Sequence, residues 1–497
     1  MNEKTFAKLL ERHIRDNGYT NYEAARAAQI NRVNLQRYLS GARVPASEVF
    51  EAILAAIPMN REEREEFCEA YELAADGTDT FYLRRFIREI LEEAGDICGK
   101  QISQHIVEET DDSGNEIEIV DGAVAVERFM WSGITRHMTA GGETQAFLYF
   151  PADRFFAGRF LPTYEVEGDS VLSRLHITQL IPLSKRADQA DDRFYNLQVL
   201  KNLIPLYFHA GSHYETCYYY RKNADGPGYG AVYPYYGVFE NSVVLFSEDM
   251  EHAVRIRNEE LVKKYREQFL SIAGHGGVTK KLVTFFEDTA KMLQFLTEHD
   301  KNGTEGTERY FIEYQPCLAL AADRDLIASV IRLQGPQREM LLAGLMKRID
   351  TVRDSSRLVH YFTENGLDEF IRTGVLAEYP ASLVRPLTPA ERIQAIESFL
   401  AVSEQENIEF GLIRDERLHL KKSINIFLSS ACGLNLILHD EKQGHRHMMI
   451  DEPSICHVFG MFIGGMKEKR DVLSAEETRK VLLEKCAHLA EKIKNET

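Results

Sequence analysis

Residues 20–45, TNYEAARAAQINRVNLQRYLSGARVP, contain two short helical patterns separated by a polar corner. The first pattern, NYEAARAA, places alanines on the face where two helices must cross closely. The second pattern, RVNLQRYLSG, repeats apolar residues every three to four positions, at Leu35, Tyr38 and Leu39. Asn31 precedes it as a favourable N-cap. The stretch therefore predicts a helix-turn-helix.

The face of the second helix that is not needed for packing carries polar and basic side chains. Such groups pair with base edges and phosphates in the major groove. Within residues 20–45 four arginines stand against a single acid, Glu23, so the local charge is basic. The residues that we predict to contact DNA are Asn21, Arg26, Asn31, Arg32, Val33, Asn34, Gln36, Arg37 and Arg43.

This stretch resembles the lambda-repressor-like, XRE-type helix-turn-helix domains. The matching positions are Thr20, Glu23, Ala25, Ile30, Asn31, Arg32, Leu35, Arg37, Gly41, Arg43 and Pro45. Asn21 and Gln29 depart from the pattern, since many members have Gln and Gly there. A positive φ at Gln29 would cost roughly 1–2 kcal/mol. The resemblance is limited to the N-terminal part of the chain and implies a compact all-α DNA-binding domain.

Five amphipathic helical patterns fill residues 1–77, which we take as this five-helix lambda-repressor-like head. The alternative interpretation is a structural helical bundle that does not bind DNA. The small polar segment 75–80 is predicted to be a linker, followed by a helix from Phe81. The remaining chain divides into a β-rich middle domain, residues 78–309, and a C-terminal domain, residues 310–497.

Composition bounds the class of protein. The chain has 497 residues, a formal net charge of −18 and 44% hydrophobic residues, which predicts a globular multidomain protein. The acidity argues against coating nucleic acid through bulk charge and favours a site-specific reader with a small basic face. No signal peptide or membrane span is evident, and seven scattered cysteines lack a CxxC pair. We therefore expect a cytoplasmic protein with reduced thiols.

The middle domain has mostly strand-like periodicity. A hairpin with its turn at residues 111–115 is predicted to continue as a strand to about residue 128, and further strands are predicted at 142–150, 173–183 and 240–247. Helices are predicted at 258–271 and 279–298.

Residues 207–239 of the middle domain are rich in tyrosine, which suggests either a ligand pocket or ordinary β-sheet. Sheet packing is the favoured interpretation. If the segment is instead a sensor for a small molecule or peptide, its candidate ligand-binding residues are Tyr219, Arg221, Tyr233 and Tyr235.

The C-terminal domain is predicted to be α+β. Helical patterns occupy residues 325–349 and 388–403, the second opened by a capping box. Four short apolar runs between 408 and 451 predict antiparallel strands, and a final helix follows Ser474. The expected fold is thus a helical head followed by a large α+β body with antiparallel sheets.

No catalytic motif of a known class is present in the sequence. His419-Leu-Lys421 is similar to the start of the phospholipase D motif, but position 426 is Ile rather than the required Asp. His209, His213 and Cys217 have helical zinc-ligand spacing, but their neighbours favour a strand, which would spread them apart. We therefore predict no enzyme activity, no metal and no cofactor.

These features favour a cytoplasmic, bacterial or phage-type transcriptional regulator. It is expected to bind double-stranded DNA as a homodimer and to carry a sensing or oligomerising body. The alternative is a component of a phage-defence or toxin–antitoxin-like system, with a catalytic or neutralising body and an autoregulating head.

Overall fold

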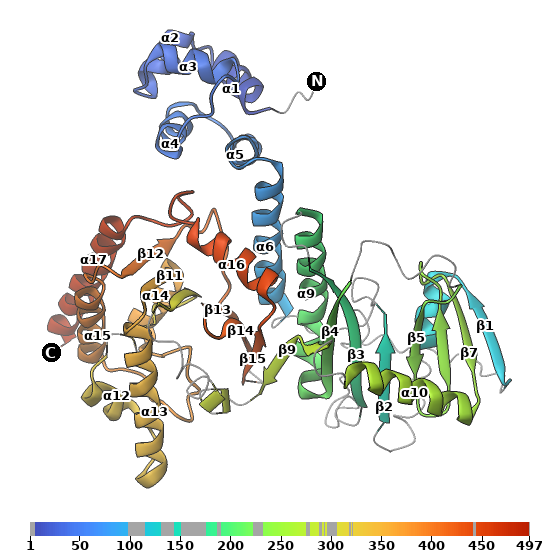
Figure 1. Ribbon diagram of the computed structural model, residues 1–497. Helices are drawn as coiled ribbons and strands as arrows, with labels where there is room; N and C mark the ends of the chain where they lie inside the picture. The colour runs from blue at the N-terminus through green and yellow to red at the C-terminus, as the bar shows by residue number, and fades with distance from the viewer. Residues whose placement is uncertain are drawn as a thin grey trace. The chain divides into compact units, whose positions relative to one another are not determined.

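The computed structural model of the chain, shown in Figure 1, forms two compact units. The first comprises Met1–Glu89 and Gly465–Val472, and the second comprises Ile90–Gly464 and Leu473–Thr497. The residues that the structure describes are 5–97, 115–130, 144–150, 175–185, 190–221, 232–274, 279–287, 291–292, 294–295, 306–317, 320, 322–440 and 444–496.

The N-terminal part of the first unit is helical and is drawn in blue in Figure 1. Its helices are α1 (Phe6–Asp16), α2 (Asn21–Ala27), α3 (Arg32–Leu39), α4 (Ser47–Ala56) and α5 (Arg61–Asp76), and α6 (Thr78–Ile97) begins in it. Each of α1 to α5 lies where the sequence pattern predicts a helix. Capping boxes start α2 and α5, at Thr20 with Glu23 and at Asn60 with Glu63.

A single aromatic and aliphatic core holds α1 to α5 together. Phe6, Phe50 and Phe67 are almost completely buried and their rings pack against one another. Ala24, Ala25 and Ala28 are buried as predicted, which lets α2 approach α3 and α4 closely.

The predicted linker at residues 75–80 is wrong. Helix α5 continues to Asp76 and α6 starts at Thr78, so Gly77 alone separates them. Gly77 has a φ of 76°, a conformation that glycine adopts without strain and other residues rarely adopt. The small polar composition marks a change of direction between two helices instead of a loop.

Residues 465–472, distant in sequence, complete the first unit. Asp471 is buried and forms ion pairs with Arg84 and Arg88 of α6. Lys469 pairs with Asp76 at the end of α5. The charges of Asp471, Arg84 and Asp76 are largely desolvated, so each depends on its partner, whereas Lys469 is partly exposed.

The second unit contains two sheets. The strands of the first are β1 (Ile117–Asp121), β2 (Thr144–Tyr149), β3 (Leu175–Ser184), β4 (Tyr214–Arg221), β5 (Tyr235–Val238), β6 (Val243–Phe246), β7 (His252–Ile256) and β8 (Lys280–Lys281), in the order β1-β7-β6-β5-β2-β3-β4-β8. Helices α9 (Ala190–Ala210) and α10 (Glu259–Ala273) pack against it.

The second sheet has the order β12-β11-β10-β13-β14-β15-β9. Its strands are β9 (Val283–Phe286), β10 (Glu308–Glu313), β11 (Arg357–Thr363), β12 (Ile408–Ile413), β13 (Ile424–Ser429), β14 (Gly433–Asp440) and β15 (Gly444–Ile450). The accompanying helices are α12 (Arg324–Val330), α13 (Gly335–Arg353), α14 (Glu364–Thr373), α15 (Pro389–Val402), α16 (Pro453–Gly464) and α17 (Ala475–Glu496).

The two sheets repeat one topology. In the first, β2, β3 and β4 are parallel neighbours, and β5, β6 and β7 continue antiparallel from the other side of β2. In the second, β10, β11 and β12 are parallel neighbours, and β13, β14 and β15 continue antiparallel from β10. Helix α10 follows β7 along the chain, and helix α16 follows β15 in the same way. The body therefore contains two copies of the same strand arrangement.

The structure confirms a helical N-terminal region followed by an α+β body, and it changes details within the body. The sheets are mixed, since three-strand parallel groups accompany the expected antiparallel pairs. Residues 123–130 are helical instead of extended, and β8 and β9 occupy the start of the segment predicted as a helix at 279–298. The first strand and most of the turn of the hairpin predicted around 111–115 lie outside the described residues.

The C-terminal strands and the last helix match the sequence pattern. Ser474 and Glu477 form the reciprocal hydrogen bonds of a capping box at the start of α17. Among the described helices, none combines the length and the apolar composition needed to span a bilayer.

Candidate nucleic-acid interface

Helices α2 and α3 pack on each other and form the predicted helix-turn-helix, joined through residues 28–31. Thr20 accepts a hydrogen bond from the Glu23 backbone and donates its own backbone N–H to the Glu23 carboxylate at 2.9 Å. These bonds hold the pKa of Glu23 below its usual value. Glu23, the single acid of the stretch, is thereby hydrogen-bonded at the N-terminus of α2.

Gln29 adopts a positive φ of 52° at the corner between the two helices. The corner thus has the left-handed conformation that glycine adopts without strain, with a glutamine in its place. A non-glycine residue in this conformation is strained by roughly 1–2 kcal/mol. The packing of α2 against α3 holds the corner in place.

Most of the residues predicted to contact DNA are exposed. Asn21, Arg26, Asn31, Arg32, Val33, Gln36, Arg37 and Arg43 lie on the surface, and Asn34 is partly buried. Asn31 has a second task, because its side-chain oxygen accepts the Val33 N–H at 2.8 Å and caps α3. The exposed face of α3 therefore combines amide and guanidinium groups with one apolar side chain.

Val33 and Tyr22 are unusually exposed apolar side chains. Val33 in the first turn of α3 is 59% exposed, and Tyr22 in the first turn of α2 is 61% exposed. Sequence reasoning omitted Tyr22, although its position next to Asn21 at the start of α2 was a usable signal. A valine packs on thymine methyl groups, and a tyrosine hydroxyl donates to phosphates.

The arginines around α3 are not used for internal ion pairs. Elsewhere in this unit Arg12, Arg61 and Arg88 pair with glutamates at 2.8–3.0 Å. Within the described part of the chain, Arg26, Arg32, Arg37 and Arg43 make no ion pair. Their charge is available for an external anion.

The tyrosine-rich segment forms a packed face of the first sheet. Tyr149 of β2 stacks on Tyr236 of β5, with ring centroids 5.1 Å apart, and its hydroxyl lies 3.0 Å from that of Tyr219 in β4. Tyr235, adjacent to Tyr236 in the strand, points to the opposite face and is buried.

The candidate ligand residues in this segment do not meet in one pocket wall. Tyr219 and Tyr235 lie on opposite faces of the sheet, and Tyr233 is half-buried just before β5. Arg221 ends β4, and its side chain lies outside the described residues. Sheet packing accounts for these tyrosines.

The weak zinc pattern at residues 209–217 is divided among different elements. Cys217 lies in β4 and His213 in the short 3-10 turn before it, whereas residue 209 lies in α9. The side chain of His209 is outside the described residues.

A buried polar cluster that sequence reasoning missed lies beside the end of β10. Glu313, Cys317 and His360 are each at most 5% exposed. Burial raises the pKa values of Glu313 and Glu378 to about 8 and lowers that of His360 to about 4. Glu313 and Glu378 are separated by more than sixty residues of intervening chain, so no local pattern connects them.

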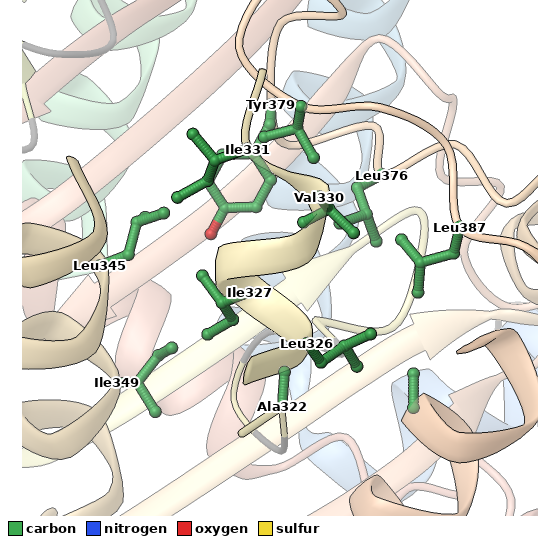
Figure 2. Close-up of a pocket in the computed structure, with 12 residues that line it drawn as sticks. Ala322, Leu326, Ile327, Val330, Ile331, Leu345, Ile349, Leu376, Tyr379 and Leu387 are labelled. Atoms are coloured by element: carbon green, nitrogen blue, oxygen red, sulfur yellow. The ribbon is translucent and has the colours of Figure 1, made fainter. Parts of the chain in front are cut away.

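An apolar cavity is lined by residues of α12 and α13 (Figure 2). Figure 2 shows Ile327 of α12 and Leu345 and Ile349 of α13 in its wall, together with Tyr379, the residue next to Glu378. The other residues of its wall are aliphatic.

Comparison with known proteins assigns no family. No family model matches the chain. No curated protein matches it. Among solved structures, TrmBL2, described as an archaeal chromatin protein with a novel mode of DNA binding, is 14% identical with a TM-score of 0.21 and covers 56% of this chain and 100% of its own. A likeness of this size carries no conclusion about fold or function.

Proposed function

We propose that the chain is a sequence-specific DNA-binding transcriptional regulator whose head is an XRE-type helix-turn-helix domain. The observation that carries the proposal is the surface of α2 and α3. It presents four arginines that make no ion pair with the residues the structure describes, beside exposed Gln36 and Val33. A purely structural bundle has no need of such a face.

The proposed division of labour follows position on the helices. Arg32, Val33, Gln36 and Arg37 of α3 read base edges in the major groove, with Asn34 beside them. Arg26, Arg43 and Asn21 contact phosphates at the edges of the interface, joined by the Tyr22 hydroxyl. Asn31 acts mainly by fixing the start of α3.

The acidic body is proposed to act by binding and assembly and not by catalysis. One helix-turn-helix head covers a small area, since single modules bury roughly 600–1,000 Å². Two copies on half-sites about 34 Å apart would supply the affinity that one lacks. We therefore propose a cytoplasmic homodimer whose body also receives an effector, which light scattering of the full chain and DNA binding with and without cell extract would test.

The decisive experiment selects duplexes from a random-sequence library with the full-length protein. A defined motif is expected to be enriched, and Arg37→Ala is expected to lose it. Arg61→Ala is the matched control, because Arg61 in α5 is equally basic and its side chain is 93% exposed. Enrichment of no motif, or equal loss of binding in both variants, would refute the proposal.

A further inference from the structure

The two repeats of the body differ in the residue that ends the first strand of each parallel group. Strands β2 and β10 hold the same place in the two sheets and end at Tyr149 and Glu313. Tyr149 stacks within the tyrosine face, whereas Glu313 is buried among acidic, thiol and imidazole groups. The two copies have therefore diverged in chemistry at this strand end.

The ligand atoms of Glu313, Cys317 and Glu378 converge. One donor atom from each lies within 4.8 Å of the other two. The Cys317 thiol is 3.5 Å from a Glu378 oxygen, and the His360 Nε2 atom is 2.9 Å from a Glu313 oxygen. Ligand atoms around a tetrahedral zinc ion, at bond lengths of about 2.0–2.3 Å, lie roughly 3.3–3.8 Å apart. The distance of 3.5 Å between the Cys317 sulfur and the Glu378 oxygen lies within this range.

Several polar atoms in this cluster have no hydrogen-bond partner within the described structure. They are Oε2 of Glu313, Nδ1 of His360 and Nη1 of Arg348. Glu313 and His360 are more than nine-tenths buried, so water does not satisfy them from bulk solvent. Buried polar atoms without partners are rare and costly. The Glu313 oxygen lies 2.9 Å from His360 Nε2, and the same ring nitrogen accepts the Cys317 N–H at 3.2 Å. A ligand of this cluster would therefore lie on the side of Glu313 that faces Cys317 and Glu378.

The segments that carry these residues are held in place. The Tyr314 N–H donates to Asn425 at 2.9 Å, and its carbonyl accepts from the Thr363 hydroxyl at 2.7 Å. The Ala377 N–H donates to Gln315 at 2.9 Å, which ties the turn of Glu378 to the end of β10. Such second contacts are what orient metal ligands.

We propose that Glu313, Cys317 and Glu378 bind a zinc ion and leave its fourth position to a water molecule. His360 accepts the Cys317 N–H at 3.2 Å and so positions the thiol. A thiolate combined with carboxylate donors favours zinc over magnesium or calcium, which prefer all-oxygen sites. This proposal replaces the expectation of a metal-free protein. It does not depend on DNA binding, because metal content is measured whether or not the head binds an operator.

The test measures zinc in untagged full-length protein by mass spectrometry. One ion per chain is expected, lost after chelation and regained on adding zinc. Cys317→Ser and Glu378→Gln are expected to weaken zinc binding at least about tenfold. Cys486→Ser is the matched control, because Cys486 is a buried thiol in α17 outside the cluster. Cobalt substitution adds a second readout, since a thiolate-to-cobalt charge-transfer band is expected in Cys486→Ser and not in Cys317→Ser.

Two results would overturn the proposal. One is the absence of stoichiometric zinc from the parent protein both as purified and after adding zinc. The other is equal zinc binding by Cys317→Ser and Cys486→Ser when circular dichroism shows that both fold. If the cluster variants do not fold, the test uses the parent protein. Chelation is expected to lower the melting temperature of the parent reversibly. An unchanged melting temperature would exclude a bound ion.

Discussion

The rings of Phe50 and Tyr71 stack face to face, with centroids 3.7 Å apart and planes 2° apart. The Tyr71 hydroxyl donates a hydrogen bond of 3.1 Å to the carbonyl of Pro45. This pair joins α4 to α5 and, through Pro45, fixes the segment that follows helix α3. The core of the head therefore supports the geometry of its exposed face.

Replacing Tyr71 with Phe keeps the stack and removes the hydroxyl. The head is expected to lose about 1 kcal/mol, because the Pro45 carbonyl loses a buried donor. Hydrogen exchange of peptides from the head, measured in the full chain, gives the local stability of the head separately from that of the body. Tyr22→Phe, at an exposed position, serves as the control and should leave exchange unchanged. Equal exchange in both variants would mean that the Pro45 contact has no role.

Gln29→Gly should stabilise the head. Glycine relieves the strain of the positive φ, and its greater freedom in the unfolded chain offsets part of the gain, leaving up to about 1 kcal/mol. Ala27→Gly, on the exposed side of α2, should instead destabilise by about 1 kcal/mol. Protection of the α2 and α3 amides from hydrogen exchange measures the effect of each substitution. A destabilised Gln29→Gly variant would show that the glutamine side chain supports the corner.

Gln36→Ala and Arg43→Ala should affect DNA binding in different ways. Loss of a base contact by Gln36 is expected to cost about 1–3 kcal/mol on the selected motif and little on scrambled duplex. Loss of Arg43, a phosphate contact, should weaken both and reduce the salt slope by about one. Anisotropy titrations at several salt concentrations measure both effects. An equal loss on both duplexes for Gln36→Ala would contradict base reading.

Asp471→Asn should strongly destabilise the first unit. Asp471 is 2% exposed and pairs with both Arg84 and Arg88, so the substitution removes the carboxylate that the two guanidinium groups share. Arg84 keeps Asp76 at 3.8 Å and Arg88 keeps Glu72 at 3.0 Å. The expected loss is about 3 kcal/mol, the lower end of the range for breaking a buried ion pair. Glu468→Gln is the control, since this exposed side chain is on the same segment. Hydrogen exchange of α6 amides at increasing urea concentration measures the unfolding free energy of both variants. A loss for Asp471→Asn no larger than that for Glu468→Gln would show that the ion pairs of Asp471 are dispensable.

Glu391 predicts a local dependence of stability on acid. Arg385 donates to it at 2.7 and 2.8 Å, and these bonds, with the Thr388 cap, lower the pKa of Glu391 to about 2. Because the folded pKa is below the unfolded one, the stabilisation is complete above the ordinary value of 4.5 and is lost as the pH falls towards 2. Solvent screening limits it to about 1–2 kcal/mol.

Urea denaturation of Glu391→Gln and the parent at pH 7 and pH 3 measures this contribution. The difference in unfolding free energy is expected to shrink at the lower pH, because Gln retains the capping geometry but not the charge. Glu397→Gln, at an exposed position of the same helix α15, should show no such change. A difference that is the same at both pH values would exclude the ion pair as its source.

Local patterns were sufficient for the head. Apolar spacing, caps at Thr20, Asn31 and Asn60, and small residues at a helix crossing all act within a few residues, so the sequence predicts α1 to α5 and the exposed face of α3. Composition misled at residues 75–80, because Gly77 is compatible with a loop and with a sharp change between two helices. Which of these forms depends on the packing of α6.

The body required the tertiary structure. Parallel pairing of β10 with β11 joins segments separated by a helical region, and no local signal specifies such a neighbour. The repeated topology is also invisible locally, because strand order is a long-range property. The sequence by itself therefore determined the helical head, its basic face and the acidic α+β character of the body. Only the tertiary structure brought Glu313, Cys317, His360 and Glu378 together, because the convergence of side chains from distant segments depends on chain topology and not on local periodicity.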